Sequence, residues 1–388
     1  MRNPLSQRIQ EIKPSGIRKF FDIAFEMKNA ITLGVGEPDF DTPWRIREEG
    51  IYSLEKGRTF YTSNSGLMEL RKEIADYMKR CLNLHFQPES EVVLTVGGSE
   101  GIDIALRCMV DEGDEVLIPQ PSFVSYEPCT AMTGATPIPI PLKNENNFKL
   151  TLEELKEYYS EKTKVIILSF PNNPTGAILT KEELEPLAAF IVEKDLYVIS
   201  DEIYAELTYA GKHASIATCL GMRERTVIIN GFSKAYAMTG WRLGYACGPE
   251  KIIEQMIKLH QFAIMCAPTT SQYAAVEALR SCQTEVEAMR KAYNQRRRFI
   301  LHAFEQMGID CFEPLGAFYV FPDIRKFGLT SEEFATRLLL EEKVCLVPGT
   351  AFGECGEGFL RISYAYSLEN IKEAFARLEK FVKKLQPA

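Results

Sequence analysis

Short apolar segments followed by polar or glycine-rich residues recur through the first part of the chain. The clearest are EVVLTV (91–96), DEVLIP (114–119), KVIILSF (164–170), DLYVIS (195–200) and RTVIIN (225–230). Such continuous apolar runs are typical of strands buried on both faces of a sheet. Between them, apolar side chains in residues 66–82 recur at three- and four-residue steps, and residues 181–195 show a similar helical pattern. This alternation predicts a mostly parallel sheet with helices on both faces.

One connection is too short for a parallel arrangement. Only residues 231–240 separate the strand at 225–230 from the next strand candidate, WRLGYACG (241–248). A parallel crossover needs about a dozen or more residues. We therefore expect 241–248 to run antiparallel and to close one side of the sheet.

The pattern changes after about residue 285. Charged helical segments there surround short strands, and a long amphipathic helix begins near Ser367. The strand candidates are GAFYVFP (316–322), VCLVPG (344–349) and FLRISYA (359–365). Fewer strands and longer helices predict a second, smaller α+β domain.

Composition excludes several classes of function. The formal net charge of the 388 residues is -8, which provides no basic field for nucleic acid or anionic lipid. Ten scattered cysteines without a C-x-x-C motif and four isolated histidines argue against disulfides and a structural metal site. The first 20 residues lack the apolar core of a signal peptide, and no run approaches the roughly 18 apolar residues of a membrane helix. We expect a soluble, cytoplasmic protein with no metal.

Distinctive residues follow five of the predicted strands: GGSEG (97–101), QPSF (120–123), PNNPTG (171–176), DEIY (201–204) and GFSK (231–234). Ligands of open α/β sheets bind beyond the carboxyl ends of the strands. Each motif also has an ordinary structural interpretation, as a turn, a helix cap, a core aromatic residue or an ion-pair partner. The G-x-G-x-x-G spacing of a dinucleotide site is absent, which argues against a nicotinamide-dependent oxidoreductase.

Lys234 stands among apolar residues, including Phe232, Ala235 and Met238. Desolvation there favours an uncharged, nucleophilic amine. A lysine, a carboxylate, an amide, a tyrosine, an arginine and an anion cradle together match the needs of pyridoxal 5'-phosphate. That cofactor presents an aldehyde, a ring nitrogen, a phenolic oxygen and a phosphate.

The segment SKAYAMTGWRLGY (233–245), with PNNPTG and SDEIY upstream, resembles the cofactor-lysine signature of fold-type I, class I/II aminotransferases. The resemblance extends from LGVGEPDF (33–40) to FLRISYA and is closest to the bacterial and archaeal aspartate/aromatic branch. It implies an α/β fold whose large domain, 46–284, contains a mostly parallel seven-stranded sheet with one antiparallel strand. Residues 1–45 and 285–388 would form the smaller α+β domain.

The resemblance also assigns roles to individual residues. Lys234 would be joined covalently to the cofactor, Asp201 would hold its ring nitrogen, and Asn173 and Tyr204 would bond its phenolic oxygen. Gly98, Ser99 and Glu100 would offer amide or hydroxyl donors to the phosphate, Arg242 would supply its guanidinium, and Tyr61 would reach the phosphate of a neighbouring subunit. Phe123 would stack on the ring, while Gly36, Asn173 and Arg361 would bind substrate, Arg361 through the α-carboxylate. Many relatives carry a hydroxyl residue at the position of Gly231, and Ser233 is the candidate to compensate.

The implied activity moves an amino group between an L-amino acid, aromatic or aspartate, and a 2-oxo acid such as 2-oxoglutarate. Lys234, Asp201 and Tyr204 would be catalytic, and ping-pong kinetics and a homodimer are expected. Two alternatives stay open: an acyl-diaminopimelate aminotransferase of lysine biosynthesis, and a β-elimination lyase on the same fold.

Overall fold

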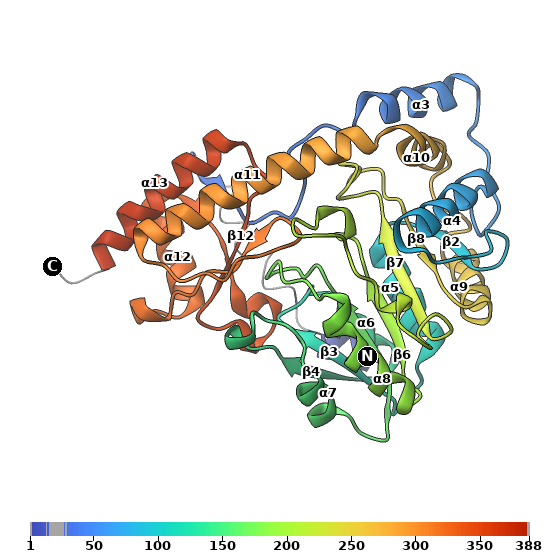
Figure 1. Ribbon diagram of the computed structural model, residues 1–388, viewed down its shortest axis with the longest axis horizontal. Helices are drawn as coiled ribbons and strands as arrows, with labels where there is room; N and C mark the ends of the chain where they lie inside the picture. Colours follow the sequence, from blue (N-terminus) through green and yellow to red (C-terminus); the bar gives the residue numbers. More distant parts are fainter. Residues whose placement is uncertain (1, 13, 15–26, 28, 386–388) are drawn as a thin grey trace.

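The computed structural model describes residues 2–12, 14, 27 and 29–385, and Figure 1 shows its arrangement. The predicted small-domain range 1–45 includes residues 1, 13, 15–26 and 28, and the range 285–388 includes 386–388, all outside the described residues. None of the helices within the described part of the chain is long and apolar enough to cross a membrane.

A seven-stranded sheet forms the larger part of the molecule, with the strand order β2-β8-β7-β6-β5-β3-β4. Its strands are β2 (Val92–Thr95), β3 (Glu115–Gln120), β4 (Thr136–Pro141), β5 (Thr163–Ser169), β6 (Tyr197–Asp201), β7 (Thr226–Gly231) and β8 (Gly244–Cys247). β8 pairs antiparallel with both β7 and β2, and the other described pairs are parallel. The antiparallel direction predicted for 241–248 is confirmed. However, β2 rather than β8 is the outermost strand.

The strand β4 was not among the strands expected from the apolar pattern. Its sequence, TPIPIP, alternates proline with other residues, and it pairs only with β3 at the edge of the sheet. Proline lacks a backbone N–H and is tolerated at an edge, where one side of the strand needs no partner. The apolar pattern therefore failed at the strand where proline replaces the usual β-branched residues.

Helices cover both faces of the sheet. One face packs on α5 (Gly98–Met109), α6 (Tyr126–Thr133) and α9 (Glu250–Ala263). The other face packs on α4 (Met68–Leu82) and α10 (Thr269–Ser281) near β2, and on α7 (Leu152–Tyr158) and α8 (Lys181–Glu193) near β5. The two helices expected within 66–82 and 181–195 are thus confirmed. Helices α1 (Gln7–Glu11) and α3 (Trp44–Glu55) lie outside these layers, and α3 packs on α10.

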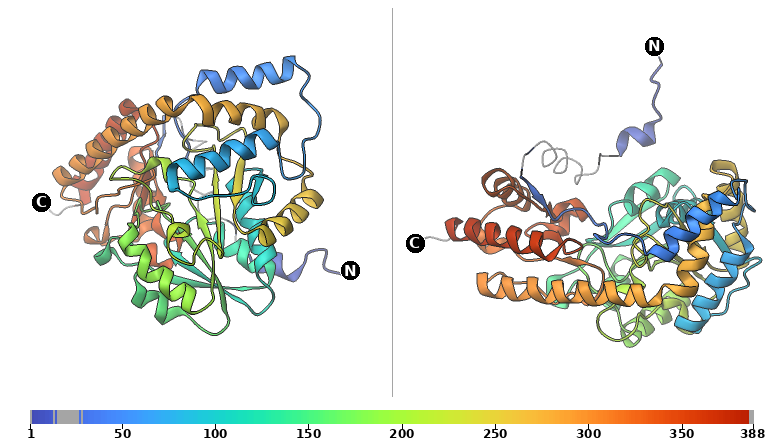
Figure 2. Two further views of the ribbon diagram at one scale, coloured as in Figure 1. Left: turned by 45° about the vertical axis from the view of Figure 1, so that its right-hand side comes forward. Right: turned by 90° about the horizontal axis from the view of Figure 1, so that it is seen from above.

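The 25-residue helix α11 (Gln283–Met307) runs from the large sheet to a smaller α+β part (Figures 1 and 2). There, α12 (Ser331–Glu342) and α13 (Leu368–Leu385) pack with short strands around one apolar core. The strands are β1 (Ile31–Thr32), β9 (Tyr319–Val320), β10 (Val344–Cys345), β11 (Val347–Pro348) and β12 (Leu360–Ser363). The smaller α+β domain and the helix expected near Ser367 are confirmed. The segment 344–349 forms two strands in different sheets rather than one.

Candidate active site

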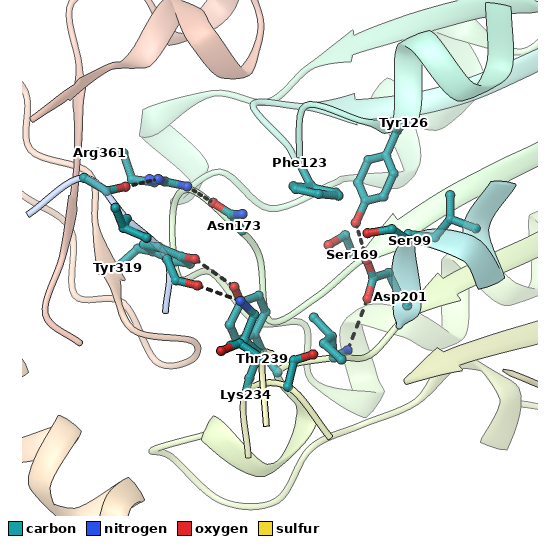
Figure 3. A pocket seen from close by; sticks show the side chains of 18 of the residues that line it. Ser99, Phe123, Tyr126, Ser169, Asn173, Asp201, Lys234, Thr239, Tyr319 and Arg361 are labelled. Atoms are coloured by element: carbon teal, nitrogen blue, oxygen red, sulfur yellow. Dashed lines mark hydrogen bonds between the residues drawn. The ribbon is translucent and has the colours of Figure 1, made fainter. Parts of the chain in front are cut away.

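A cavity of about 320 Å³ lies where the carboxyl ends of the large-sheet strands face the smaller part (Figure 3). Asp201 and Ser169 end β6 and β5, and Lys234 follows β7. Tyr319 and Arg361 enter from β9 and β12 on the opposite side. Further lining residues are Gly34, Val35, Gly36, Gly98, Ser99, Ile102, Phe123, Tyr126, Asn173, Ile203, Tyr204, Ser233, Thr239 and Arg242.

Lys234 lies in the turn after β7 and is half-buried. Its Nζ donates a 2.6 Å hydrogen bond to the carbonyl oxygen of Gly36. Burial, followed by the positive charge of Arg361, lowers the pKa of this lysine to about 8. Near neutral pH, roughly a tenth of the amine is therefore neutral, far more than for an ordinary lysine, as suits a nucleophile or base.

Asp201 is buried and accepts two hydrogen bonds. Tyr126 Oη donates to Oδ2 over 2.6 Å, and the backbone N–H of Ile203 donates to Oδ1 over 3.2 Å. Burial raises the pKa of Asp201, while both hydrogen bonds lower it because they favour the ionised form. The carboxylate is directed into the cavity, where a cationic group would stabilise it further (Figure 3).

The first turn of α5 and the side chain of Arg242 meet at one end of the cavity. Helix-terminal N–H groups without an intrahelical partner favour an anion. Arg242 is exposed, and its Nη1 and Nη2 donate to Thr239 O and Val96 O over 3.1 and 3.4 Å. Gly97, with φ +80°, permits this approach, because a Cβ there would lie 2.5 Å from Arg242 Nη2. The geometry is suited to a phosphate.

Arg361 provides a buried cation at the opposite end. Its Nη1 donates to Asn173 Oδ1 over 2.9 Å, and its Nη2 donates to Gly34 O. Its Nε is buried and has no hydrogen-bond partner within the part of the chain that the structure describes. Burial lowers the pKa of Arg361. A carboxylate ligand would compensate both the charge and the unsatisfied donor.

Two tyrosine hydroxyl groups meet between these ends. Tyr204 Oη and Tyr319 Oη lie 2.8 Å apart, and burial raises the pKa of both phenols, so that both stay protonated at neutral pH. The guanidinium of Arg361 lies 4.7 Å from the centroid of the Tyr319 ring. Tyr319 therefore contacts Arg361 with its ring and Tyr204 with its hydroxyl group, and so lies between Arg361 and the centre of the cavity.

Comparisons with known proteins agree with this architecture. Residues 28–378 match the family described as aminotransferase class I and II. The chain belongs to this family. It is 47% identical over 382 residues to an aspartate aminotransferase of Pyrococcus abyssi, covering 98% of each chain. The solved aromatic aminotransferase of Pyrococcus horikoshii has 44% identity and a TM-score of 0.91, with 95% of this chain and 100% of that one covered. A probable N-acetyl-LL-diaminopimelate aminotransferase of Bacillus subtilis is 40% identical over 388 residues, covering 100% of this chain and 98% of that protein.

The structure brings together most of the residues that the resemblance to aminotransferases singled out. Lys234, Asp201, Asn173, Tyr204, Phe123, Gly36, Gly98, Ser99, Arg242 and Arg361 all line the cavity. Two others do not line it. The Tyr61 side chain lies outside the cavity and is 81% exposed. The Glu100 carboxylate accepts from the backbone N–H of Val96 and contacts His260 Nδ1, and the donor role expected of the Glu100 backbone amide stays a prediction.

Gly231, the departure from the aminotransferase pattern, ends β7 opposite Gly244 of β8. A Cβ at Gly231 would lie 2.9 Å from the Cα of Gly244, so a larger residue would require the strands to shift. Ser233 is buried and lines the cavity, whereas Gly231 does not. Ser233, next to Lys234, therefore places a hydroxyl residue in this cavity, as does Thr239.

Sequence reasoning missed Tyr126 and Tyr319. Tyr126 lies three residues after the QPSF motif, at the start of α6. A polar group so soon after a strand end could have identified it as a candidate site residue. Tyr319 lies within the apolar segment 316–322 and gave no such signal. Within the described residues, no group of three or more His, Cys, Asp and Glu side chains could hold a metal ion.

Proposed function

We propose that this protein is a pyridoxal 5'-phosphate-dependent aminotransferase acting on aspartate or aromatic L-amino acids, with a 2-oxo acid such as 2-oxoglutarate as acceptor. The observation that carries the proposal is Lys234, whose pKa is lowered to about 8, in one cavity with the buried Asp201 and Arg361. These groups suit the cofactor aldehyde, the cofactor ring nitrogen and the substrate carboxylate, respectively. Two half-reactions at the same site would give ping-pong kinetics.

The cavity offers a partner for each polar group of the cofactor. We assign the phosphate to the first turn of α5, with Ser99 and Arg242, and the ring nitrogen to Asp201. The phenolic oxygen would accept from Tyr204 and from the amide N–H₂ of Asn173, whose Oδ1 already accepts from Arg361. Phe123 lies at the cavity wall beside Tyr126 and would cover the ring (Figure 3).

Bound pyridoxal 5'-phosphate supplies an aldehyde that carries the amino group and a ring that withdraws electrons from the substrate Cα. Asp201 would hold the proton on the ring nitrogen, and the Tyr126 hydrogen bond favours the ionised carboxylate that this requires by opposing the rise in its pKa on burial. Lys234 would remove the Cα proton, because its lowered pKa leaves a neutral amine to accept it. Arg361 would fix the α-carboxylate and so hold Cα close to Lys234.

The residues in the walls of the cavity determine which side chains of a substrate amino acid can be accepted. Val35, Phe123 and Tyr319 provide apolar and aromatic surface, which supports an aromatic donor. Its cations, within the described residues, are Lys234, Arg242 and Arg361, and each already has a proposed partner. A distal carboxylate, as in aspartate or 2-oxoglutarate, would need a further cation, and we propose that a second subunit supplies it.

A homodimer would provide that second subunit. Phe60, Tyr61 and Phe262 are each 81% exposed, and large exposed apolar side chains favour an interface. Hydrogen bonds from Thr269 Oγ1 to Phe60 O and from Asn64 Nδ2 to Met265 O place the Tyr61 loop beside the connection between α9 and α10. We propose that Tyr61 reaches the phosphate site of the partner subunit.

We also propose that residues 46–284 form the large domain and that residues 1–45 and 285–388 form the small one. The parallel pairing of β1 with β10 supports a shared small domain for the two ends of the chain. Buried thiols such as Cys247 and Cys282 support a reducing, cytoplasmic location.

The assay that tests the function uses cofactor-loaded protein, 2-oxoglutarate and a panel of single amino acids, with glutamate formation as readout. Aspartate or an aromatic amino acid should give the highest kcat/KM. A higher value with an acyl-diaminopimelate would replace the proposed substrate but keep the reaction. Release of pyruvate and ammonia without any glutamate would contradict transamination and favour the lyase alternative.

A further inference from the structure

A buried pair of ionisable side chains lies behind the first turn of α5, outside the cavity. Glu100, in that turn, accepts a hydrogen bond from the backbone N–H of Val96 through Oε2. Its Oε1 lies 2.6 Å from Nδ1 of His260 on α9. His260 is fully buried, and its Nε2 has no hydrogen-bond partner within the described residues. Nδ1 is thus the nitrogen that carries the structural interaction.

The pair holds the turn that connects β2 with α5. Glu100 fixes the N–H of Val96, while Arg242 Nη2 donates to the C=O of the same residue over 3.4 Å. The next residue, Gly97, has φ +80° and lies against Arg242. Val96 therefore connects the His260–Glu100 pair to Arg242, and through Gly97 to the start of α5. These are the two parts of the proposed phosphate site.

The charge of Glu100 requires an explanation, because a carboxylate close to a phosphate site opposes anion binding. The side chain of Glu100 is only 10% exposed, so water compensates little of its charge. An ionised carboxylate can only accept, so His260 Nδ1 must carry the proton in this 2.6 Å contact. Together with the N–H of Val96, this donor satisfies the carboxylate at a place outside the cavity lining. Without that donor, the carboxylate would lose its orientation and disturb the site.

We propose that Glu100 and His260 are positioning residues for the cofactor phosphate: His260 orients Glu100, and Glu100 fixes the Val96–Gly97 turn. This inference rests on the proposed function, because it requires a phosphate at the α5 terminus. The inference predicts that changing these residues weakens the part of the binding affinity that comes from the cofactor phosphate, and leaves the affinity for the rest of the cofactor unchanged.

The test compares the dissociation constants of pyridoxal 5'-phosphate and of pyridoxal for the protein freed of cofactor. The two compounds differ only by the phosphate. His260→Leu should weaken pyridoxal 5'-phosphate binding roughly tenfold, while pyridoxal binding changes less than about twofold. His260→Asn should restore most of the affinity, because its amide nitrogen takes the place of Nδ1, whereas His260→Gln places its amide near the position of Nε2 and should not. Met256→Ala, one turn earlier and equally buried on α9, is the control for damage to helix packing.

An unchanged ratio of the two dissociation constants in His260→Leu would overturn the inference, as would equal losses in His260→Leu and Met256→Ala. If His260→Leu does not fold, equal ratios for His260→Asn and His260→Gln would overturn it. A wild-type protein that binds both compounds equally would refute the phosphate cradle but not the Lys234 assignment. A wild-type protein that binds neither compound would refute the proposed function itself.

Discussion

Burial shifts the pKa values of three charged groups in the cavity, Lys234, Asp201 and Arg361, and in each case the shift favours the neutral form of the group. The pKa of Lys234 falls to about 8, that of Arg361 is also lowered, and that of Asp201 is raised. Neighbouring residues then modify each effect: Arg361 lowers the pKa of Lys234 further, and Tyr126 opposes the rise at Asp201. These neighbours can be tested separately from the charged groups.

Removing the charge of Arg361 should raise the pKa of Lys234. Only the neutral amine reacts with an aldehyde, so the rate at which cofactor-free protein takes up pyridoxal 5'-phosphate should rise with pH and level off above about pH 8. In Arg361→Met, the midpoint of this profile should lie at higher pH, because a nearby positive charge is lost. Arg107→Met, which removes a charge on the outer side of α5, is the control. A midpoint that stays in place or falls in Arg361→Met would contradict the assignment.

Tyr126→Phe should lower the activity at acidic pH, so that the pH range in which the protein is active becomes narrower. The lost hydrogen bond favoured ionised Asp201, so its pKa should rise and the ionised fraction at acidic pH should fall. We expect kcat/KM to fall roughly threefold to tenfold at the acid end, with a smaller effect at alkaline pH. Tyr293→Phe is a matched control, since the Tyr293 hydroxyl is buried without a partner among the described residues. Equal pH profiles for the two variants would rule out this role of Tyr126.

Single residues were predicted from the sequence where a motif followed a strand end. Lys234, Asp201 and Asn173 each follow a clear strand, and all three line the cavity. Tyr319 could not be found this way, since nothing distinguishes it from core residues in its apolar strand. Glu100 follows a strand end too, and the donor role expected of its backbone amide stays a prediction. The direction of its carboxylate, toward Val96 and His260, is a separate feature that the strand-end pattern does not contain.

At the level of elements, the antiparallel strand β8 brings the α5 terminus and the Lys234 turn together. Gly244 begins β8 and pairs with Gly231 at the end of β7. A Cβ at Gly244 would lie 2.7 Å from the backbone of both Gly97 and Gly98. This contact accounts for glycine at position 244, because only a residue without a side chain lets β8 lie directly against Gly97 and Gly98 at the start of α5.

Gly244→Ala should therefore damage both stability and cofactor binding. The added methyl group meets backbone atoms that cannot rotate away, so we expect a loss of about 1–3 kcal/mol in unfolding free energy. Affinity for pyridoxal 5'-phosphate should fall in parallel, as measured by titration of the cofactor-free protein. Gly240→Ala is the control, because no atom lies within 4 Å of the position of its Cβ. A Gly244→Ala protein with normal stability and affinity would refute this account of the cradle.

Element prediction succeeded where apolar runs were continuous and failed where local chemistry interrupted them. The short 231–240 connection correctly predicted the direction of β8. Proline hid β4, and the two short strands β10 and β11 pair in different sheets within six residues that look like one strand. Such pairings depend on distant partners, here β1 and β12, which local patterns do not contain.

At the scale of the whole molecule, the two parts of the structure provide opposite ends of one cavity (Figure 3). The large sheet contributes Asp201 and Lys234, while β9 and β12 contribute Tyr319 and Arg361. Tyr61 lies outside this cavity and is exposed, so its proposed role requires a second subunit.

Mixing two variants, one impaired in cofactor binding and one inactive, tests that role. A Tyr61→Phe homodimer should bind cofactor weakly, and a Lys234→Ala homodimer should be inactive. If Tyr61 serves the partner's site, each hybrid dimer has one intact site, and random mixing should give roughly a quarter of wild-type activity at limiting cofactor. Subunits are exchanged by mild denaturation and dilution, and the mixture is assayed beside each variant alone. Activity that never exceeds the sum of the two separate variants would contradict a shared site.

The central claim is that Lys234 joins the cofactor and moves the substrate proton. Its most direct test is the visible absorption spectrum of cofactor-loaded protein before and after addition of one amino acid, with no oxo acid present. We predict a band in the wild-type protein that converts to the amine form of the cofactor as one equivalent of 2-oxo acid appears, and no such conversion in Lys234→Ala. Conversion at the wild-type rate in Lys234→Ala, or a wild-type band that no amino acid changes, would contradict the account.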